Sequence, residues 1–199
     1  MTDGPALPGL VRVVFVDANV LYSRVLRDYL LYAADEEVIA VAWSAAVLEE
    51  TVEHLIENVA AFIAESGARL IDAMNGAFPY AEVEVAPEHL EAVASFLLPD
   101  EGDRHVLAAA IAAEATVLCT ANTRDFPAAV VAALGLEVMT PDALLSALVT
   151  EFPSQMLTVH ATSVERLRGA TDESTIAALQ RAGAPTAAAL VAGLLNNHE

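Results

Sequence analysis

Residues 97–110 read LLPDEGDRHVLAAA, an acidic turn that leads directly into an apolar helix of small residues. We expect at least one carboxylate of this turn at the mouth of the helix, where it caps free N–H groups and where the helix dipole favours anions. Alone, the pattern predicts only an ordinary helix start. Two further stretches make it more informative, FVDANVL at residues 15–21 and LCTANTRDFP at residues 118–127, because both place an acid where an apolar strand ends.

Apolar runs and helical spacing alternate along most of the chain. Strand patterns cover residues 11–16, 38–42, 81–85, 116–120 and 136–140, and helical patterns cover residues 20–34, 44–70, 87–96, 104–110 and 141–149, with a break expected at Gly67. Such alternation predicts an α/β fold, an open parallel sheet flanked by helices on both faces. Ligands of these sheets bind beyond the carboxyl ends of the strands, which is where Asp17 and Asp125 fall.

The strand signals stop near residue 150. Helical segments at residues 156–167, 174–182 and 186–195 follow, separated by turns that contain glycine. We therefore expect a main domain at residues 10–150 and a small helical C-terminal extension at residues 151–199.

Composition limits the classes of protein to consider. The 199 residues suffice for one domain with a sizeable core, and the 56% hydrophobic content includes no apolar run near the roughly 18 residues of a membrane helix. The start of the chain lacks the pattern of a secretory signal, so we expect a cytoplasmic protein. The single cysteine, Cys119, excludes an internal disulfide. The net charge of −19 argues against general affinity for nucleic acids, so any such contact must be local.

All nine basic residues are arginines, and four that lie within ten residues of the acidic motifs are candidates for substrate contact: Arg24, Arg27, Arg104 and Arg124. Because guanidinium groups bind phosphate in a fork geometry, this placement suits a substrate that carries phosphate. The same arginines would equally balance neighbouring acids, so both interpretations stay open.

Four acids from separate parts of the chain can meet at one end of the predicted sheet: Asp17, Glu50, Asp103 and Asp125. Two carboxylates about 4 Å apart repel by roughly 4 kcal/mol at an effective dielectric constant near 20, so the cluster requires protonation or a bound cation. Oxygen ligands without His or Cys select Mg²⁺ or Mn²⁺ rather than zinc, with Asp17, Asp103 and Asp125 as the metal ligands. These ions serve phosphodiester hydrolysis, because they activate water and stabilise the leaving oxygen.

Short polar side chains accompany the acids. Asn19, Thr120 and Asn122 are expected to orient a water molecule or hold the acids in place, and Ser44 is expected to cap the helix that carries Glu50. The adjacent Glu49 remains an alternative to Glu50. The histidines show no metal-ligand spacing, and His105, two residues after Asp103, is expected to point away on its helix.

These motifs resemble the PIN-domain ribonucleases, specifically the VapC-like toxins of toxin–antitoxin pairs. The resemblance covers about residues 11–148, and the stretches at residues 97–110 and 118–127 are its most specific parts. The helical tail resembles the C-terminal extension of one subgroup. Asp17, Glu50, Asp103 and Asp125 match the acidic positions of the family, whereas Asn122 stands where many relatives carry another acid.

The resemblance implies an endoribonuclease that depends on Mg²⁺ or Mn²⁺ and is held inactive by a small antitoxin protein. A homodimer remains an alternative to a monomer. Two other functions stay open: a catalytically silent PIN-like protein that binds RNA or an antitoxin, favoured by Asn122 and the low basicity, and a metal-dependent phosphatase of another doubly wound family.

Overall fold

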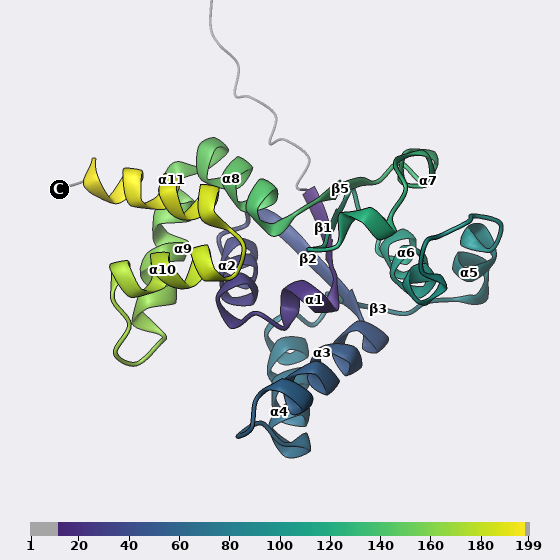
Figure 1. The fold of residues 1–199 in the computed structure, drawn as a ribbon, viewed down its shortest axis with the longest axis horizontal. Helices are drawn as coiled ribbons and strands as arrows, with labels where there is room; N and C mark the ends of the chain where they lie inside the picture. Colours follow the sequence, from purple (N-terminus) through teal and green to yellow (C-terminus); the bar gives the residue numbers. More distant parts are fainter. Residues whose placement is uncertain (1–11, 198–199) are drawn as a thin grey trace, which may run out of the picture.

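The computed structural model describes residues 12–197 and shows a single sheet surrounded by helices (Figure 1). In chain order its elements are β1 (Arg12–Val16), α1 (Ala18–Leu21), α2 (Arg24–Asp35), β2 (Ile39–Ser44), α3 (Ala45–Asn58), α4 (Ala64–Ala77), β3 (Glu82–Val83), α5 (Pro87–Val93), the 3₁₀ turn η1 (Glu101–Asp103), α6 (Arg104–Ala112), β4 (Val117–Cys119), the 3₁₀ turn η2 (Thr123–Asp125), α7 (Ala128–Ala133), β5 (Glu137–Met139), α8 (Pro141–Glu151), α9 (Pro153–Glu165), α10 (Asp172–Arg181) and α11 (Pro185–Asn196).

The five strands are parallel and lie in the order β3-β2-β1-β4-β5. Strand β1 lies at the centre, where Val14 pairs with Val41 of β2 and with Val117 of β4. Phe15 and the free thiol of Cys119 are fully buried. Burial on both faces explains the unbroken apolar runs, since a parallel sheet is covered on each side by its connecting helices. The predicted α/β fold is confirmed.

The strand order places a crevice between β1 and β4. From β1 the chain moves outward to β2 and β3, then returns past β1 to form β4 and β5 on the other side. Ligands of open parallel sheets bind where the connections diverge in this way. Asp17 follows β1 directly and Thr120 follows β4, so both residues lie at this crevice.

The C-terminal helices pack on α2 and α8, two helices beside the sheet, instead of standing apart from the main domain. Helix α9 lies against α2, and α11 lies against α8, on the left of the sheet in Figure 1. Met156, Leu179 and Val191 are fully or almost fully buried in the same apolar cluster as the strands. The three expected helical segments are confirmed. Within residues 12–197, no helix is both long and apolar enough to cross a membrane.

Two helical predictions require correction. The single helix expected at residues 20–34 is divided into α1 and α2 at Tyr22 and Ser23. Gly67 does not break a helix, because the break falls between Asn58 and Ala64 and Gly67 lies inside α4. A Cβ atom at position 67 would lie 2.3 Å from Cγ1 of Val52 on α3, so the glycine permits two helices to approach closely.

The strand predictions differ only in their ends. The strand expected at residues 81–85 has two residues, Glu82 and Val83, and lies at the edge of the sheet. Val11, the expected first residue of the first strand, lies outside the described residues.

Candidate active site

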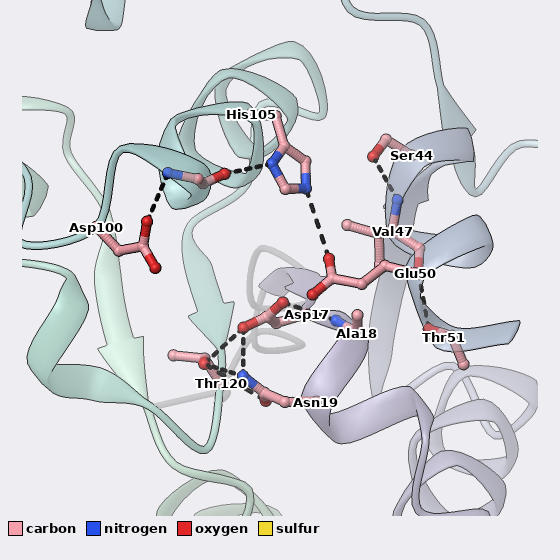
Figure 2. Close-up of polar contacts among 11 residues, drawn as sticks. Asp17, Ala18, Asn19, Ser44, Val47, Glu50, Thr51, Asp100, His105 and Thr120 are labelled. Atoms are coloured by element: carbon pink, nitrogen blue, oxygen red, sulfur yellow. Dashed lines mark hydrogen bonds and ion pairs between the residues drawn. The ribbon is translucent and has the colours of Figure 1, made fainter. Parts of the chain in front are cut away.

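Asp17 is the most constrained acid of the crevice (Figure 2). Its Oδ1 accepts a hydrogen bond from the backbone N–H of Ala18 at 2.7 Å, which makes Asp17 the N-cap of α1. Its Oδ2 accepts hydrogen bonds from Nδ2 of Asn19 at 2.6 Å and from the hydroxyl of Thr120 at 2.7 Å. Burial raises the pKa of this carboxyl group, and the hydrogen bonds from Thr120 and Ala18 oppose that rise. Asn19 and Thr120 were expected to hold the acids in place. Their hydrogen bonds to Asp17 link the ends of the neighbouring strands β1 and β4.

Asn19 and Thr120 also fix the loop after β4. The Asn19 amide donates to Oγ1 of Thr120 at 3.0 Å, while its Oδ1 accepts from the backbone N–H of Ala121 at 2.9 Å. Oγ1 of Thr120 accepts from the backbone N–H of Asn122 at 3.1 Å. Each polar atom of this network has a partner of the correct type, as buried polar groups require. The network holds the acid of β1 and the loop of β4 in one arrangement.

Glu50 enters the crevice from α3. Ser44 begins this helix as predicted, because its Oγ accepts from the backbone N–H of Val47 at 3.3 Å. Figure 2 shows Glu50 extending from α3 into the space that Asp17 and His105 also face. Oε2 of Glu50 lies 3.8 Å from Nε2 of His105. Glu49, the alternative acid, is exposed on the same helix.

Asp103 and Asp125 interact through charge. Burial, followed by the negative charges of Asp125, Asp17 and Asp100, raises the pKa of Asp103 to about 6. Asp125 accepts a hydrogen bond from the side-chain amide of Asn122, which keeps its carboxylate in the η2 turn. The structure thus places Asp125 and Asp17 close enough to Asp103 to disfavour the ionised form of Asp103.

The oxygen donors fit a hard divalent cation in their chemistry. A cation between Asp17, Asp103 and Asp125 would relieve the repulsion that raises the pKa of Asp103. Over residues 12–197, however, no three His, Cys, Asp or Glu side chains already form a metal-binding group. The arrangement is therefore a set of coupled acids with the donor type that Mg²⁺ or Mn²⁺ takes.

Two of the four arginines assigned to substrate phosphate have other partners. NH1 of Arg27 donates to the carbonyl oxygen of Leu21 at 2.7 Å, at the break between α1 and α2. The guanidinium of Arg104 donates to the carbonyl oxygens of Val93 and Phe96. Free carbonyl groups at a helix end require such donors, which explains why these side chains are occupied. Arg27 and Arg104 are thus engaged by backbone carbonyl groups within the fold.

The remaining two arginines are exposed. Arg24 pairs with Asp28 one turn along α2, at 3.4 Å, and Arg124 lies in η2 beside Asp125. An exposed pair of this kind contributes little and exchanges readily, so both guanidinium groups remain accessible to a phosphate.

Two polar residues at the crevice were missed or misplaced by sequence reasoning. Asp100 accepts a hydrogen bond from the backbone N–H of Gly102 at 2.8 Å and adds to the charge around Asp103. His105 faces Glu50 instead of pointing away on α6. Asp100 could have been predicted from the sequence, because it lies in the acidic turn. The direction of His105 could not, because it depends on how α6 and α3 pack.

Comparison with known proteins gives one match. A family model described as the PIN domain matches residues 12–124 of the chain. The matched segment contains Asp17, Glu50 and Asp103 and ends one residue before Asp125. No curated protein and no solved structure matches the chain.

Proposed function

The chain belongs to the PIN-domain family, whose members are generally nucleases, and from this we propose that it is an endoribonuclease dependent on Mg²⁺ or Mn²⁺. The observation that supports this most directly is the network in which Asp17 is held by Asn19 and Thr120 at the ends of the two central strands. We further propose that the protein is the toxin of a toxin–antitoxin pair, on the resemblance of its motifs to VapC-like toxins.

The residues divide the chemistry between them. Asp17, Asp103 and Asp125 would hold the cation, which supplies an activated water molecule and charge stabilisation at the cleaved phosphodiester. Thr120 and Asn19 keep the Asp17 carboxylate in place through their hydrogen bonds. Glu50, whose side chain is 42% exposed and faces the crevice, is positioned to accept a proton. Arg24 and Arg124 would contact substrate phosphate.

Cleavage of RNA by the purified protein tests this proposal. We expect total RNA to be cut with Mg²⁺ or Mn²⁺ and to remain intact with a chelator. Asp17→Asn should lower the rate by at least about a hundredfold, because it removes a charge aimed at the cation and the transition state. Asp72→Asn, which changes an exposed acid on α4, is the matched control. Equal cleavage by wild-type protein and folded Asp17→Asn would refute the proposal.

An apolar cleft supports the proposal of an antitoxin partner. A cavity of about 1060 Å³ begins beside Asn19 and Ala121 and continues along α2, α3, α4, α9 and α10, with a mostly apolar lining that also contains Arg24, Arg27, Asp28 and Arg181. A cleft of this kind suits an apolar helix of a partner protein, whereas the net charge of −19 favours basic segments of that partner outside the cleft. We propose the protein encoded by a small reading frame beside the gene as this antitoxin. Addition of that protein should stop RNA cleavage.

A catalytically silent binding protein is the second candidate function. It is favoured by Asn122, which stands where many relatives carry another acid, and by the low basicity of the chain. This candidate predicts RNA or antitoxin binding without metal-stimulated cleavage, so turnover on any RNA removes it. Hydrolysis of small phosphate esters but not of RNA would instead favour a phosphatase.

A further inference from the structure

A pair of aromatic rings lies one helical turn from the residues of the crevice. The rings of Tyr22 and His54 meet edge to face, with their centroids 6.2 Å apart and their planes at 79°. Tyr22 ends α1, three residues after Asn19, and His54 lies on α3, four residues after Glu50. Residues with these spacings are neighbours on one face of a helix. Each of the two helices therefore presents a residue of the crevice and, about one turn further along, an aromatic ring.

A second pair of tyrosine and histidine shows how a purely structural contact of this kind differs. The rings of Tyr29 and His160 also lie 6.2 Å apart, but both residues are almost fully buried and a hydrogen bond of 2.5 Å joins them. His54, in contrast, is exposed and Tyr22 is half-buried. Within residues 12–197, the side chains of Tyr22 and His54 make a ring contact with each other and no hydrogen bond. This second pair is therefore closed, whereas the pair beside the crevice is accessible to a ligand.

Tyr22 also lines the apolar cavity at the end nearest the acids. The cavity of about 1060 Å³ is bounded there by Asn19, Tyr22 and Ala121. Asn19 donates a hydrogen bond to Asp17, so this end of the cavity adjoins the crevice. In an edge-to-face pair, the ring that presents its edge keeps both of its faces free of its partner. A flat aromatic group in this part of the cavity can therefore reach the ring pair.

The charge of the chain favours a ligand that binds by stacking. Phosphate contacts provide much of the affinity of ordinary RNA-binding proteins, and a net charge of −19 opposes them. Stacking of bases on aromatic side chains accepts any base and uses no charge on the protein. Arg24 is exposed and lines the same cavity, so it offers a local cation to a phosphate group. An aromatic pair with a single nearby cation suits one nucleotide of an RNA strand.

We propose that Tyr22 and His54 form a subsite that stacks one base of single-stranded RNA next to the cleaved phosphodiester bond. This inference rests on the proposed nuclease function and identifies the part of the substrate that these rings recognise. The antitoxin proposed for the same cavity would exclude the base from the rings, which gives its inhibition a direct cause. The alternative role of the pair is to pack α1 on α3, which lie against each other in Figure 1. A packing role would affect every substrate equally.

Leucine and phenylalanine at position 22 separate stacking from packing. Tyr22→Leu keeps an apolar side chain but removes the ring, whereas Tyr22→Phe keeps the ring. With saturating Mn²⁺, we expect Tyr22→Leu to raise KM for a single-stranded RNA oligonucleotide by about 5- to 50-fold with little change in kcat. Tyr22→Phe should stay within about twofold of wild type. Equal KM values for Tyr22→Leu and wild type would overturn the proposal, as would a loss confined to kcat.

The matched control is the same substitution at another tyrosine. Tyr80 is 96% exposed and does not line the cavity. Tyr80→Leu therefore removes a ring of the same kind away from the proposed subsite. We expect it to leave both KM and kcat unchanged, and a rise in KM equal to that of Tyr22→Leu would overturn the proposal.

A substrate that lacks one base tests whether the ring and the base meet. Nucleotides on either side of the cleaved bond are replaced, one at a time, by an abasic ribonucleotide. At the position that contacts the rings, wild-type protein should lose kcat/KM, and Tyr22→Leu should lose less than about twofold more, because its stacking partner is already absent. Losses that multiply at every position would show that ring and base act independently, which would overturn the proposal.

Binding without cleavage keeps this inference distinct from the nuclease proposal. With a chelator present, we expect millimolar adenosine monophosphate to shift the proton NMR signals of the Tyr22 and His54 rings. Ribose 5-phosphate carries the same sugar and phosphate without a base, so it should leave these signals unchanged. This result would support the subsite even if the protein cleaves no RNA. The absence of a shift with adenosine monophosphate, or equal shifts with both ligands, would overturn the proposal whatever the activity.

Discussion

We expect the carboxyl group of Asp103 to lower the stability of the folded protein at neutral pH. Its pKa is raised from 3.8 to about 6 by burial and by the charges of Asp125, Asp17 and Asp100. A raised pKa in the folded state means that folding favours the protonated acid. The protonated Asp103 therefore makes its full contribution to the free energy of unfolding below about pH 3.8, and this contribution is lost as the pH rises through about 6.

Asp103→Asn should consequently raise the melting temperature while it abolishes RNA cleavage. At neutral pH and with a chelator present, we expect a rise of about 1–4 °C, because the buried charge and its repulsion are removed. Thermal denaturation across the pH range checks this, and the difference from wild type should disappear as the pH falls below about 4. The exposed change Asp72→Asn should show no such dependence on pH.

Manganese provides a second measurement on the same variant. A cation that binds the folded state raises the melting temperature of the wild-type protein, and it should raise that of Asp103→Asn less. If Asp103→Asn lowers the melting temperature, the charge of Asp103 does not destabilise the folded protein. The assignment of a shared cation to the three acids then loses its support.

Residue by residue, the sequence predicted the parts of the site that depend on chain position. Asp17 and Thr120 follow apolar strands directly, so their place at the carboxyl edge of a parallel sheet was predictable. The direction of His105 was not, since it depends on the hydrogen bond to Gly102 and on the packing of α6 near α3. The partners of Arg104 were not predictable either, because they are backbone carbonyl groups of Val93 and Phe96, at and just beyond the end of another helix.

At the scale of elements, the contact between α3 and α4 depends on one glycine. Gly67→Ala would place a Cβ atom 2.3 Å from Cγ1 of Val52, which is too close for two carbon atoms that are not bonded to each other. We expect a loss of about 1–3 kcal/mol in the free energy of unfolding, despite the better helix propensity of alanine. Chemical denaturation measures this loss, and the double variant Gly67→Ala, Val52→Ala should recover part of it.

The same helix supplies a control for this prediction. Gly76 also lies in α4, and a Cβ atom there would meet nothing within 4 Å. Gly76→Ala should therefore stabilise the protein by about 0.5–1 kcal/mol. Equal effects of the two substitutions would contradict the close approach of α3 and α4 at Gly67.

A series of three hydrogen-bonded side chains, Tyr29 and His160 buried and Asp172 exposed, connects α2 to the C-terminal helices. The hydroxyl of Tyr29 lies 2.5 Å from Nδ1 of His160, and Nε2 of His160 lies 3.1 Å from Oδ1 of Asp172. Burial lowers the pKa of His160 and raises that of Tyr29, so both groups remain neutral in the fold. With Nε2–H donating to the carboxylate, Nδ1 is left free to accept a hydrogen bond from the tyrosine hydroxyl.

The buried His160 predicts a contribution to folding stability that is lost in mild acid. A lowered histidine pKa contributes stability that is full above 6.5, the ordinary pKa, and is lost as the pH falls, because the unfolded chain binds the proton first. The melting temperature of the wild-type protein should exceed that of His160→Gln most above pH 6.5, and the difference should shrink below it. A difference that is constant with pH would contradict a neutral buried His160. His54→Gln, on the exposed face of α3, is the control.

At the scale of the whole molecule, the fold class was predictable because strand and helix patterns alternate. Unbroken valine-rich runs indicated a sheet covered on both faces, and in the structure the central strands are buried in this way. The strand order β3-β2-β1-β4-β5 was not predictable from these patterns, because it depends on how helices pack across the sheet. The crevice between β1 and β4, where the acids meet, follows from that order.

The net charge of −19 gives the proposed nuclease an unusual response to salt. RNA and an acidic protein repel each other at long range, so low ionic strength should slow their association. Raising monovalent salt from about 10 mM to about 150 mM shortens the Debye length from about 30 Å to about 8 Å and screens this repulsion. With saturating Mn²⁺, we expect kcat/KM for an RNA oligonucleotide to rise by about two- to fivefold over this range, while kcat changes little. Proteins that bind RNA through many cations show the opposite trend, because added salt weakens their phosphate contacts. A steady fall in kcat/KM would indicate that attraction of RNA by exposed arginines such as Arg24 and Arg124 outweighs its repulsion by the net charge of the whole molecule.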